Sequence, residues 1–284
     1  MDRNKIRKEY ERINRQFEKL YYPKVYKAIK SKISSLISKV ENDGVQSAMS
    51  SLSTELANFQ LSAVVKELYV RVGVRHAHES ERRLKKEVLK RFGLNQAWID
   101  FINNYLRMFL LEKITFKVNE TTRDYLLKVL RESIEKGWGV SETVKHLDQL
   151  PFPKYQAARI VRTEVNRAAN VGVKAQGESF EYELNKEWIS VHDHRTRGTN
   201  PEDDANHLGM DGQIVDYYSR FRDPRNGHLL DFPGDKEAEA EDVINCRCQS
   251  ANIAKRDENG RLIPKKSRIT VIRDFNRTQR TVTI

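Results

Sequence analysis

The chain has 284 residues, of which 38% are hydrophobic and 32% are charged, and its mean hydropathy is −0.71. Every apolar stretch is interrupted by charge within a few residues, so the sequence predicts no membrane-spanning helix. The basic N-terminal segment is not expected to be a secretory signal, because no apolar run follows it. Two cysteines are too few for a disulfide-stabilised scaffold and favour a reducing compartment.

The net charge of +11 is unevenly distributed. Residues 1–40 carry 12 Lys and Arg against 4 Asp and Glu, and residues 255–284 carry 9 against 3. Residues 201–242 are acidic, with 12 Asp and Glu against 4 Lys and Arg. Clustered basic side chains are what phosphate binding requires, so both ends are expected to contact DNA or RNA without sequence specificity. The alternative is that these runs are ordinary solvated surfaces.

Residues 1–150 are predicted to be helical. Apolar side chains recur at steps of three and four within residues 4–40, which is typical of an amphipathic helix. Pro23 is expected to kink or divide this helix, and residues 41–45 to interrupt it. Further helices are predicted over residues 46–92, 95–114, 119–137 and 141–150, with a Thr/Asn cap before the third and Gly137 at its end. His76 and His78 point to different sides of a helix and are expected on its solvated surface.

Two prolines within residues 151–153 mark a predicted domain boundary. After them, a helix over residues 154–178 and strands near residues 186–194, 212–218 and 242–253 predict a small α+β domain over 151–254. A basic tail, 255–284, is expected to form a hairpin about residues 274–277. The predicted fold class is therefore α+β, with an extended and mostly helical N-terminal region over 1–150.

Five short motifs follow one another within residues 155–253. They are Arg-Thr-Glu at 162–164, Trp188 with Asp-His-Arg-Thr-Arg at 193–197, His207 with Asp-Gly at 211–212, Pro-Gly-Asp at 233–235, and Asn-Cys-Arg-Cys at 245–248. In this order they resemble the phage Mu protein F-like family of minor head proteins, also called phage head morphogenesis proteins. The spacer over residues 198–206 is longer than the family pattern.

This resemblance implies a non-enzymatic minor head protein of a tailed phage, which enters the procapsid during assembly. The implied partners are the portal protein, other head or scaffold proteins and double-stranded DNA, with no membrane. The implied location is the interior of the phage head in the virion, after assembly in the host bacterial cytoplasm. The basic ends fit a contact with packaged DNA independently. An assembly role without any DNA contact is the alternative.

The two cysteines, Cys246 and Cys248, are predicted to lie on one face of a strand. Residues two apart in a strand are separated by roughly 6.6 Å, whereas a disulfide prefers Cα atoms about 5.5–6 Å apart. Two thiolates on one face can instead bind zinc, which needs two further ligands. The alternatives are two small buried core side chains or a redox role. The candidate ligands to complete the zinc site are His207 and Asp193, with His194 or Asp211 in place of the latter.

A metal-dependent nuclease acting on DNA is the alternative function, with Asp193, His207 and the acidic residues 202–204 as its metal site. The order of histidines and asparagine that a His-Asn-His nuclease needs is not found, and residues 201–209 do not fit a calcium-binding loop. Nothing in the sequence marks an oxyanion hole for a cysteine nucleophile. The sequence therefore predicts no enzymatic activity.

Overall fold

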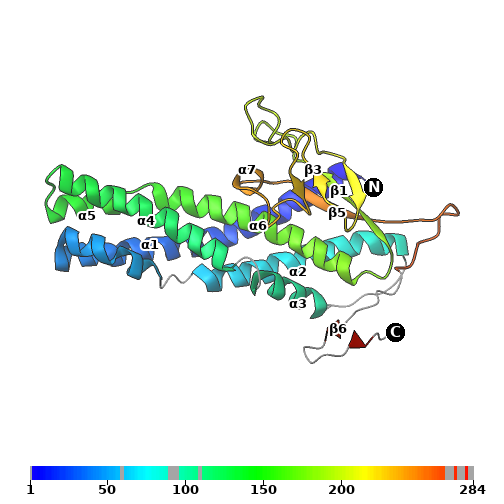
Figure 1. The fold of residues 1–284 in the computed structure, drawn as a ribbon, viewed down its shortest axis with the longest axis horizontal. Coiled ribbons are helices and arrows are strands. Elements are labelled where there is room, and N and C mark those ends of the chain that lie inside the picture. The colour runs from blue at the N-terminus through cyan, green and yellow to red at the C-terminus, as the bar shows by residue number, and fades with distance from the viewer. Residues whose placement is uncertain are drawn as a thin grey trace.

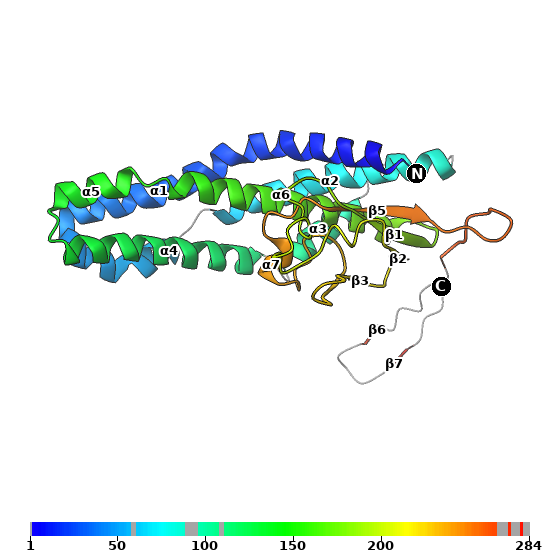
Figure 2. The same ribbon diagram turned by 90° about the horizontal axis from the view of Figure 1, so that it is seen from above.

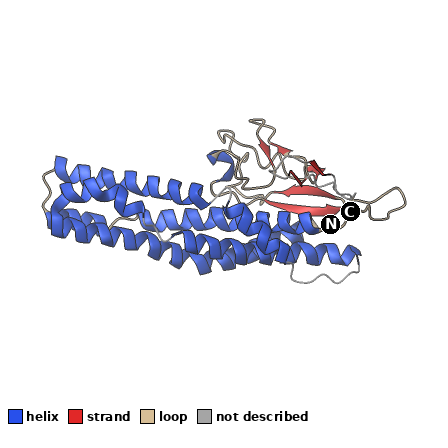
Figure 3. Cartoon of the chain, turned by 60° about the horizontal axis from the view of Figure 1, so that its bottom comes forward, coloured by secondary structure: helices blue, strands red, loops and turns tan. Residues whose placement is uncertain are grey.

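The computed structural model describes residues 2–57, 61–88, 96–107, 111–265, 272–273 and 279–280. Long helices run side by side along the longest axis of the molecule, and a small region of strands and loops covers one end of them (Figures 1 and 3). The fold is α+β, as predicted. Among the described residues no helix is long and apolar enough to cross a membrane. The helices are α1 (Arg3–Ala57), α2 (Leu61–Val88), α3 (Gln96–Tyr105), α4 (Leu111–Glu135), α5 (Val140–Asp148), α6 (Phe152–Ser179) and the short α7 (Ala240–Val243).

The main sheet has three antiparallel strands in the order β2-β1-β5. Its central strand β1 (Leu184–Ile189) pairs with β2 (Ile214–Asp216) and along its whole length with β5 (Gln249–Ala254). Two smaller antiparallel pairs are β3 (Phe221–Arg222) with β4 (Leu229–Leu230), and β6 (Ile272–Arg273) with β7 (Gln279–Arg280). The predicted turn at residues 274–277 lies outside the described residues.

Pro23 does not divide the first helix, which was one of the two effects predicted for it. This proline lies inside α1 and does not end it, because Tyr21 and Val25 on either side are anchored in the core. The interruption falls at Gly44, where φ is 81° and ψ is 169°. A residue without a Cβ adopts this left-handed φ at little cost, so the predicted break over residues 41–45 is confirmed as a kink.

Two helix starts differ from their predictions. Helix α4 begins at Leu111 and continues through residues 119–122, where the Thr122 hydroxyl donates to the carbonyl of Val118 (2.6 Å) and caps no helix. Helix α5 begins at Val140 with Gly139 as its N-cap, one residue before its predicted start. The predicted stop at Gly137 is confirmed, since its φ of 64° follows the end of α4. The predicted end of the second helix, at residues 92–93, lies outside the described residues.

Helix α6 is the centre of the molecule. Its apolar side chains, Val165 and Ala168 among them, belong to one core with Ile189 of β1 and Ala251 of β5. It crosses α2 closely at Gly172, where an added Cβ would lie 2.0 Å from the carbonyl oxygen of Gly73. The predicted boundary near residue 151 coincides with the short connection between α5 and α6. The core continues across it, and the division into two domains stays a prediction.

His76 of α2 is fully buried, so its predicted place on the solvated surface is wrong, whereas His78 is partly exposed. The His76 ring lies against Tyr10, with 4.3 Å between ring centroids. Burial, reinforced by the nearby positive charges of Arg83 and Arg75, lowers the pKa of His76 from 6.5 to about 3. The folded protein therefore holds His76 neutral, in contact with an aromatic ring.

This buried histidine makes the fold sensitive to acid. Below pH 6.5 the unfolded chain binds a proton at His76, and the folded protein does not until about pH 3. The free energy of unfolding is therefore expected to fall as the pH drops from 6.5 towards 3, by up to about 1.4 kcal/mol per pH unit. His76→Phe keeps the ring contact and removes this component. Urea unfolding at pH 7, 5.5 and 4.5 measures it, with His78→Phe as the control; an unchanged slope in His76→Phe would contradict the assignment.

Candidate functional site

The Arg-Thr-Glu motif lies on α6 and holds the Asn-Cys-Arg-Cys segment. The backbone N–H of Asn245 donates to the Thr163 hydroxyl (3.0 Å), and the Arg162 guanidinium donates to the Asn245 side-chain oxygen (3.2 Å). Asn245 has a φ of 58°, a left-handed conformation that asparagine tolerates better than most residues. The first and last motifs are therefore in direct contact, although 82 positions separate Asn245 from Thr163.

Two asparagines on α6 continue this attachment. The side-chain amides of Asn166 and Asn170 both donate to the carbonyl of Cys248, at 3.0 and 3.3 Å. The Asn170 side-chain oxygen accepts from the backbone N–H of Ser250 (2.8 Å). Side chains of α6 thus satisfy backbone groups of the cysteine segment and the start of β5, which fixes this edge of the sheet on the helix.

A buried charged group joins the same helix to the Pro-Gly-Asp loop. The Arg167 guanidinium donates to both carboxylate oxygens of Glu164 (3.0 Å each) and to the carbonyl of Gly234 (2.7 Å). The Tyr69 hydroxyl of α2 donates to the same carboxylate (2.5 Å). Gly234 has a φ of 85° and lies against Arg167. Helix α6 therefore binds the backbone of the Pro-Gly-Asp loop, and glycine allows the left-handed conformation at this position.

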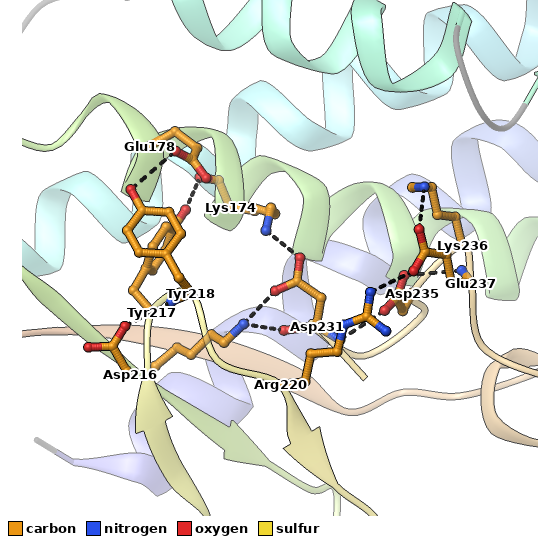
Figure 4. A network of polar contacts seen from close by, with 11 residues as sticks. Lys174, Glu178, Asp216, Tyr217, Tyr218, Arg220, Asp231, Asp235, Lys236 and Glu237 are labelled. Atoms are coloured by element: carbon orange, nitrogen blue, oxygen red, sulfur yellow. Dashed lines mark hydrogen bonds and ion pairs between the residues drawn. The ribbon is translucent and has the colours of Figure 1, made fainter. Parts of the chain in front are cut away.

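The rest of that loop is ordered by a second polar network (Figure 4). The Asp231 carboxylate accepts from Lys174 of α6 and from Lys186 of β1, the latter at 2.5 Å. Burial opposes its ionisation, but the two ammonium groups outweigh this and lower the pKa of Asp231. The Asp235 carboxylate accepts the backbone N–H groups of Asp231 (2.8 Å) and Glu237 (3.1 Å). The aspartate of the Pro-Gly-Asp motif therefore closes its own loop.

The Asp-His-Arg-Thr-Arg motif caps a turn and reaches the cysteine segment. The Asp193 carboxylate accepts two hydrogen bonds from Arg247, at 2.6 and 2.5 Å, and one from the backbone of Arg195 (3.0 Å). The Arg247 contact, above all, lowers the pKa of Asp193 well below its ordinary value. Arg197 donates to the carbonyl of Ile244 (2.5 Å). This motif thus holds the residues on both sides of Cys246.

The two cysteines meet His207 in a buried cluster. The Cys246 and Cys248 sulfurs lie 3.6 and 3.7 Å from the same His207 atom, Nδ1, and all three side chains are at most 3% exposed. The Trp188 ring is edge-on to His207, with 5.2 Å between centroids. Ser190 donates to the carbonyl of His207 (2.5 Å), and its Oγ lies 3.7 Å from the Cys248 sulfur.

An aspartate lies on the far side of the His207 ring. Asp242, fully buried in α7, has its Oδ1 3.8 Å from His207 Nε2 and its Oδ2 2.8 Å from His228 Nδ1. Burial opposes the charged form of His207, but Cys246 and Asp242 outweigh it and raise its pKa to about 9. The pKa of Cys246 is lowered, chiefly by its hydrogen bond with Cys248.

Residues 124–251 match the family described as Phage Mu protein F like protein. Residues 124–251 belong to the phage Mu protein F-like family. This match supports a role for the protein in phage head morphogenesis. The match begins inside α4, ahead of residue 155 where the resemblance begins, and so includes all of α5. No curated protein and no solved structure matches the chain.

Within this Mu protein F-like region the structure brings three of the four predicted metal ligands together. Asp193 is not among them, because its carboxylate is bound by Arg247. The substitutes are also elsewhere: His194 is exposed, and Asp211 accepts from Ser190 N and pairs with Arg3. The residues that meet are Cys246, Cys248 and His207.

Two features of the cluster were not anticipated from the sequence. The cysteines precede β5, which begins at Gln249, so the strand predicted over 242–253 is too long at its start. Residues 240–243 form α7 instead, and this helical turn carries Asp242 to the imidazole. The sequence signal for Asp242 was its place four positions before Cys246. This spacing is a weak signal unless residues 240–243 are known to form a helical turn. The metal role of the whole set stays a prediction.

Proposed function

We propose that this protein is a minor head protein of a tailed phage, associated with the portal vertex and able to bind double-stranded DNA without sequence specificity. The family match carries the head morphogenesis part of this proposal. In this proposal the protein is assembled into the head in the host bacterial cytoplasm and then lies inside the phage head in the virion. Other head or scaffold proteins are the further partners, and no catalytic role is proposed.

The end of the helical bundle farthest from the sheet supports a protein contact. It is formed by α4, α5 and the kinked part of α1 (Figure 2). Two apolar side chains are exposed on either side of the turn between α4 and α5, Ile134 of α4 at 42% and Val140 of α5 at 43%. We assign the portal contact to this turn. A pull-down with the portal protein tests it: Ile134→Glu/Val140→Glu should lose capture, while Ile214→Glu, an exposed position on β2, should keep it.

A row of basic side chains on α1 supports the DNA contact. Lys8, Arg12, Arg15 and Lys19 follow one another at steps of four, three and four, which places them on one face over roughly 16 Å of helix. All four are exposed. Arg12 and Arg15 pair with glutamates on the same helix, and such exposed pairs are cheap to break. We call these four residues the basic stripe. Arg162 and Arg195 line the hollow beside Arg15 and extend it.

The basic stripe predicts salt-sensitive DNA binding. If its four side chains contact four phosphates, affinity for a duplex should fall by roughly 100-fold between 50 and 200 mM salt. Changing all four to glutamine should remove most of the binding and flatten this salt dependence. A gel-shift titration measures both, with random-sequence duplexes of equal length.

A charge-matched control separates the stripe from net charge. Lys128 and Arg131 of α4, Lys136 of the turn after it and Lys145 of α5 are exposed, far from the stripe along the bundle (Figure 2). Their change to glutamine removes the same charge. This variant should keep its affinity within a few-fold. Equal losses in the two variants would mean that the stripe has no special role. No shift at low salt in the native protein would leave an assembly role without DNA contact.

The nuclease alternative makes a different prediction. Its two key residues are apart in the structure, because Asp193 binds Arg247 while His207 is buried with the cysteines. Incubation of the purified protein with plasmid and Mg²⁺, Mn²⁺ or Zn²⁺ tests it. We expect no cleavage; cleavage that Asp193→Ala or His207→Ala abolishes would overturn the structural role.

A further inference from the structure

We propose that Cys246, Cys248 and His207 bind one zinc ion through their two sulfurs and Nδ1, and that Asp242 positions the imidazole from its other nitrogen. This site does not depend on the proposed head function. Its ligand set differs from the one expected from sequence, since Asp242 takes part as a positioning residue and Asp193 does not.

The distances fit a metal. In a tetrahedral zinc site with Zn–S near 2.3 Å and Zn–N near 2.0–2.1 Å, a sulfur and a nitrogen ligand lie about 3.5–3.6 Å apart. Cys246 and Cys248 lie 3.6 and 3.7 Å from His207 Nδ1, and all three ligand atoms fall within 4.8 Å of one another. A single hydrogen bond between the imidazole and a sulfur explains only one of these contacts, because Nδ1 offers either one lone pair or one N–H. One ion between the three atoms accounts for both.

The far side of the imidazole supports the same arrangement. A histidine that binds a metal commonly donates its other ring N–H to a carboxylate, which fixes its tautomer. Asp242 Oδ1 is 3.8 Å from His207 Nε2, and among the described residues neither buried atom has a hydrogen-bond partner. A small shift of the ring would form that bond. His228 holds the other Asp242 oxygen at 2.8 Å, so the carboxylate is already oriented.

A second grouping, His207 with Asp223 and Asp242, is a weaker candidate. Asp223 is fully buried, and its two carboxylate oxygens already accept the backbone N–H groups of Asn206 and Arg225, at 2.7 Å each. It therefore has little capacity left for a cation. The two sulfurs also favour zinc over hard cations, which prefer oxygen ligands.

The three ligands come from two loops that the sheet alone does not join. His207 lies in the segment between β1 and β2, and the cysteines lie just before β5. A zinc ion there would cross-link these segments, and its charge would balance two buried thiolates. The fourth position of the tetrahedron is left to an oxygen ligand, either water or the Ser190 hydroxyl, whose Oγ is 3.7 Å from the Cys248 sulfur.

The test is metal analysis of the full chain. Protein reconstituted with Zn²⁺ and freed of loose metal should hold one zinc per chain. Co²⁺ in its place should give the intense visible bands of a tetrahedral site and a thiolate charge-transfer band. Both thiols should react with a disulfide reagent only after a chelator is added. A well-folded native protein with less than about 0.1 equivalent of zinc and no cobalt spectrum would overturn the proposal.

Variants then test each assignment. Cys246→Ser, Cys248→Ser and His207→Gln should lose the metal. Because these changes can also impair folding, Asp242→Asn is the sharper variant: it keeps all three ligands and should weaken zinc binding about 10- to 100-fold. His228→Gln, which touches only the outer oxygen of Asp242, should bind zinc within a few-fold of the native protein. Full affinity in Asp242→Asn would overturn its assignment as a positioning residue.

Discussion

Changing Arg167 to methionine is expected to lower the free energy of unfolding by about 3–5 kcal/mol. Arg167 is 7% exposed, and its guanidinium is the cation that pairs with the buried Glu164 carboxylate. Without it, among the described residues that carboxylate keeps the hydrogen bond from the Tyr69 hydroxyl, and the carbonyl of Gly234 loses its donor. Urea denaturation followed by circular dichroism measures the loss.

Two further variants show whether the loss of stability comes from breaking the Glu164–Arg167 ion pair or from removing any arginine of α6. Arg159→Met removes an exposed arginine from the same helix and should change stability by no more than about 0.5 kcal/mol. Glu164→Leu combined with Arg167→Met removes both charges, so its loss should be smaller than the sum of the two single losses. A loss below about 1 kcal/mol in Arg167→Met would show that the pair is not needed to hold the Pro-Gly-Asp loop.

Changing Gly172 to alanine should be about as damaging, although alanine normally stabilises a helix by about 0.5–1 kcal/mol over glycine. The new Cβ would lie 2.0 Å from the carbonyl oxygen and 2.6 Å from the carbonyl carbon of Gly73. Backbone atoms cannot rotate away as a side chain does, so α2 and α6 must separate. We expect a loss of about 3 kcal/mol or more, at or above the upper end of overpacking costs.

Alanine substitutions at two other glycines are expected to cost less stability than Gly172→Ala. A Cβ at Gly73 would meet the tip of Ile102 at 2.7 Å, which a rotamer change relieves, and the carbonyl oxygen of Ala168 at 3.3 Å, so about 1–2 kcal/mol is expected. A Cβ at Gly139 would meet nothing within 4 Å. Replacing this glycine N-cap with alanine should lower the free energy of unfolding by about 1 kcal/mol at most. Thermal unfolding of the three variants side by side measures this order. A Gly172→Ala variant as stable as Gly139→Ala would mean that the helices cross less closely.

The sequence predicts the class of fold well, because helical periodicity and turn residues are local signals. The kink at Gly44 and the stop at Gly137 both rest on left-handed backbone conformations that glycine favours. The errors have non-local causes. Pro23 stays within a helix because core contacts on both sides hold it, and His76 is buried because α1 covers it through Tyr10. Neither contact is visible in a window of neighbouring residues.

The site was predictable in part for the same reason. The pairing of His207 with the cysteines follows from residue chemistry, since few side chains complement two thiols. Asp193 was chosen because it ends a strand, but Arg247, between the two cysteines, binds it instead. Asp242 was missed because the prediction extended a strand over a helical turn. Order along the chain identified the motifs, and only the fold shows that α6 holds most of them together.

The contacts of α1 with the sheet have a consequence for how the chain folds during synthesis. Arg3 pairs with Glu187 (2.8 Å) and Asp211 (2.6 Å), and the Tyr10 hydroxyl donates to the carbonyl of Ser250 (3.4 Å), 240 positions later. At roughly 5–20 residues per second, the ribosome needs on the order of 10–50 s to make the partner of Tyr10. Until then Tyr10 lacks this acceptor, and β1 lacks the strand that pairs with it along its whole length. Contacts this distant in sequence slow folding, and nascent chains that stop short of β5 leave that edge of β1 unpaired.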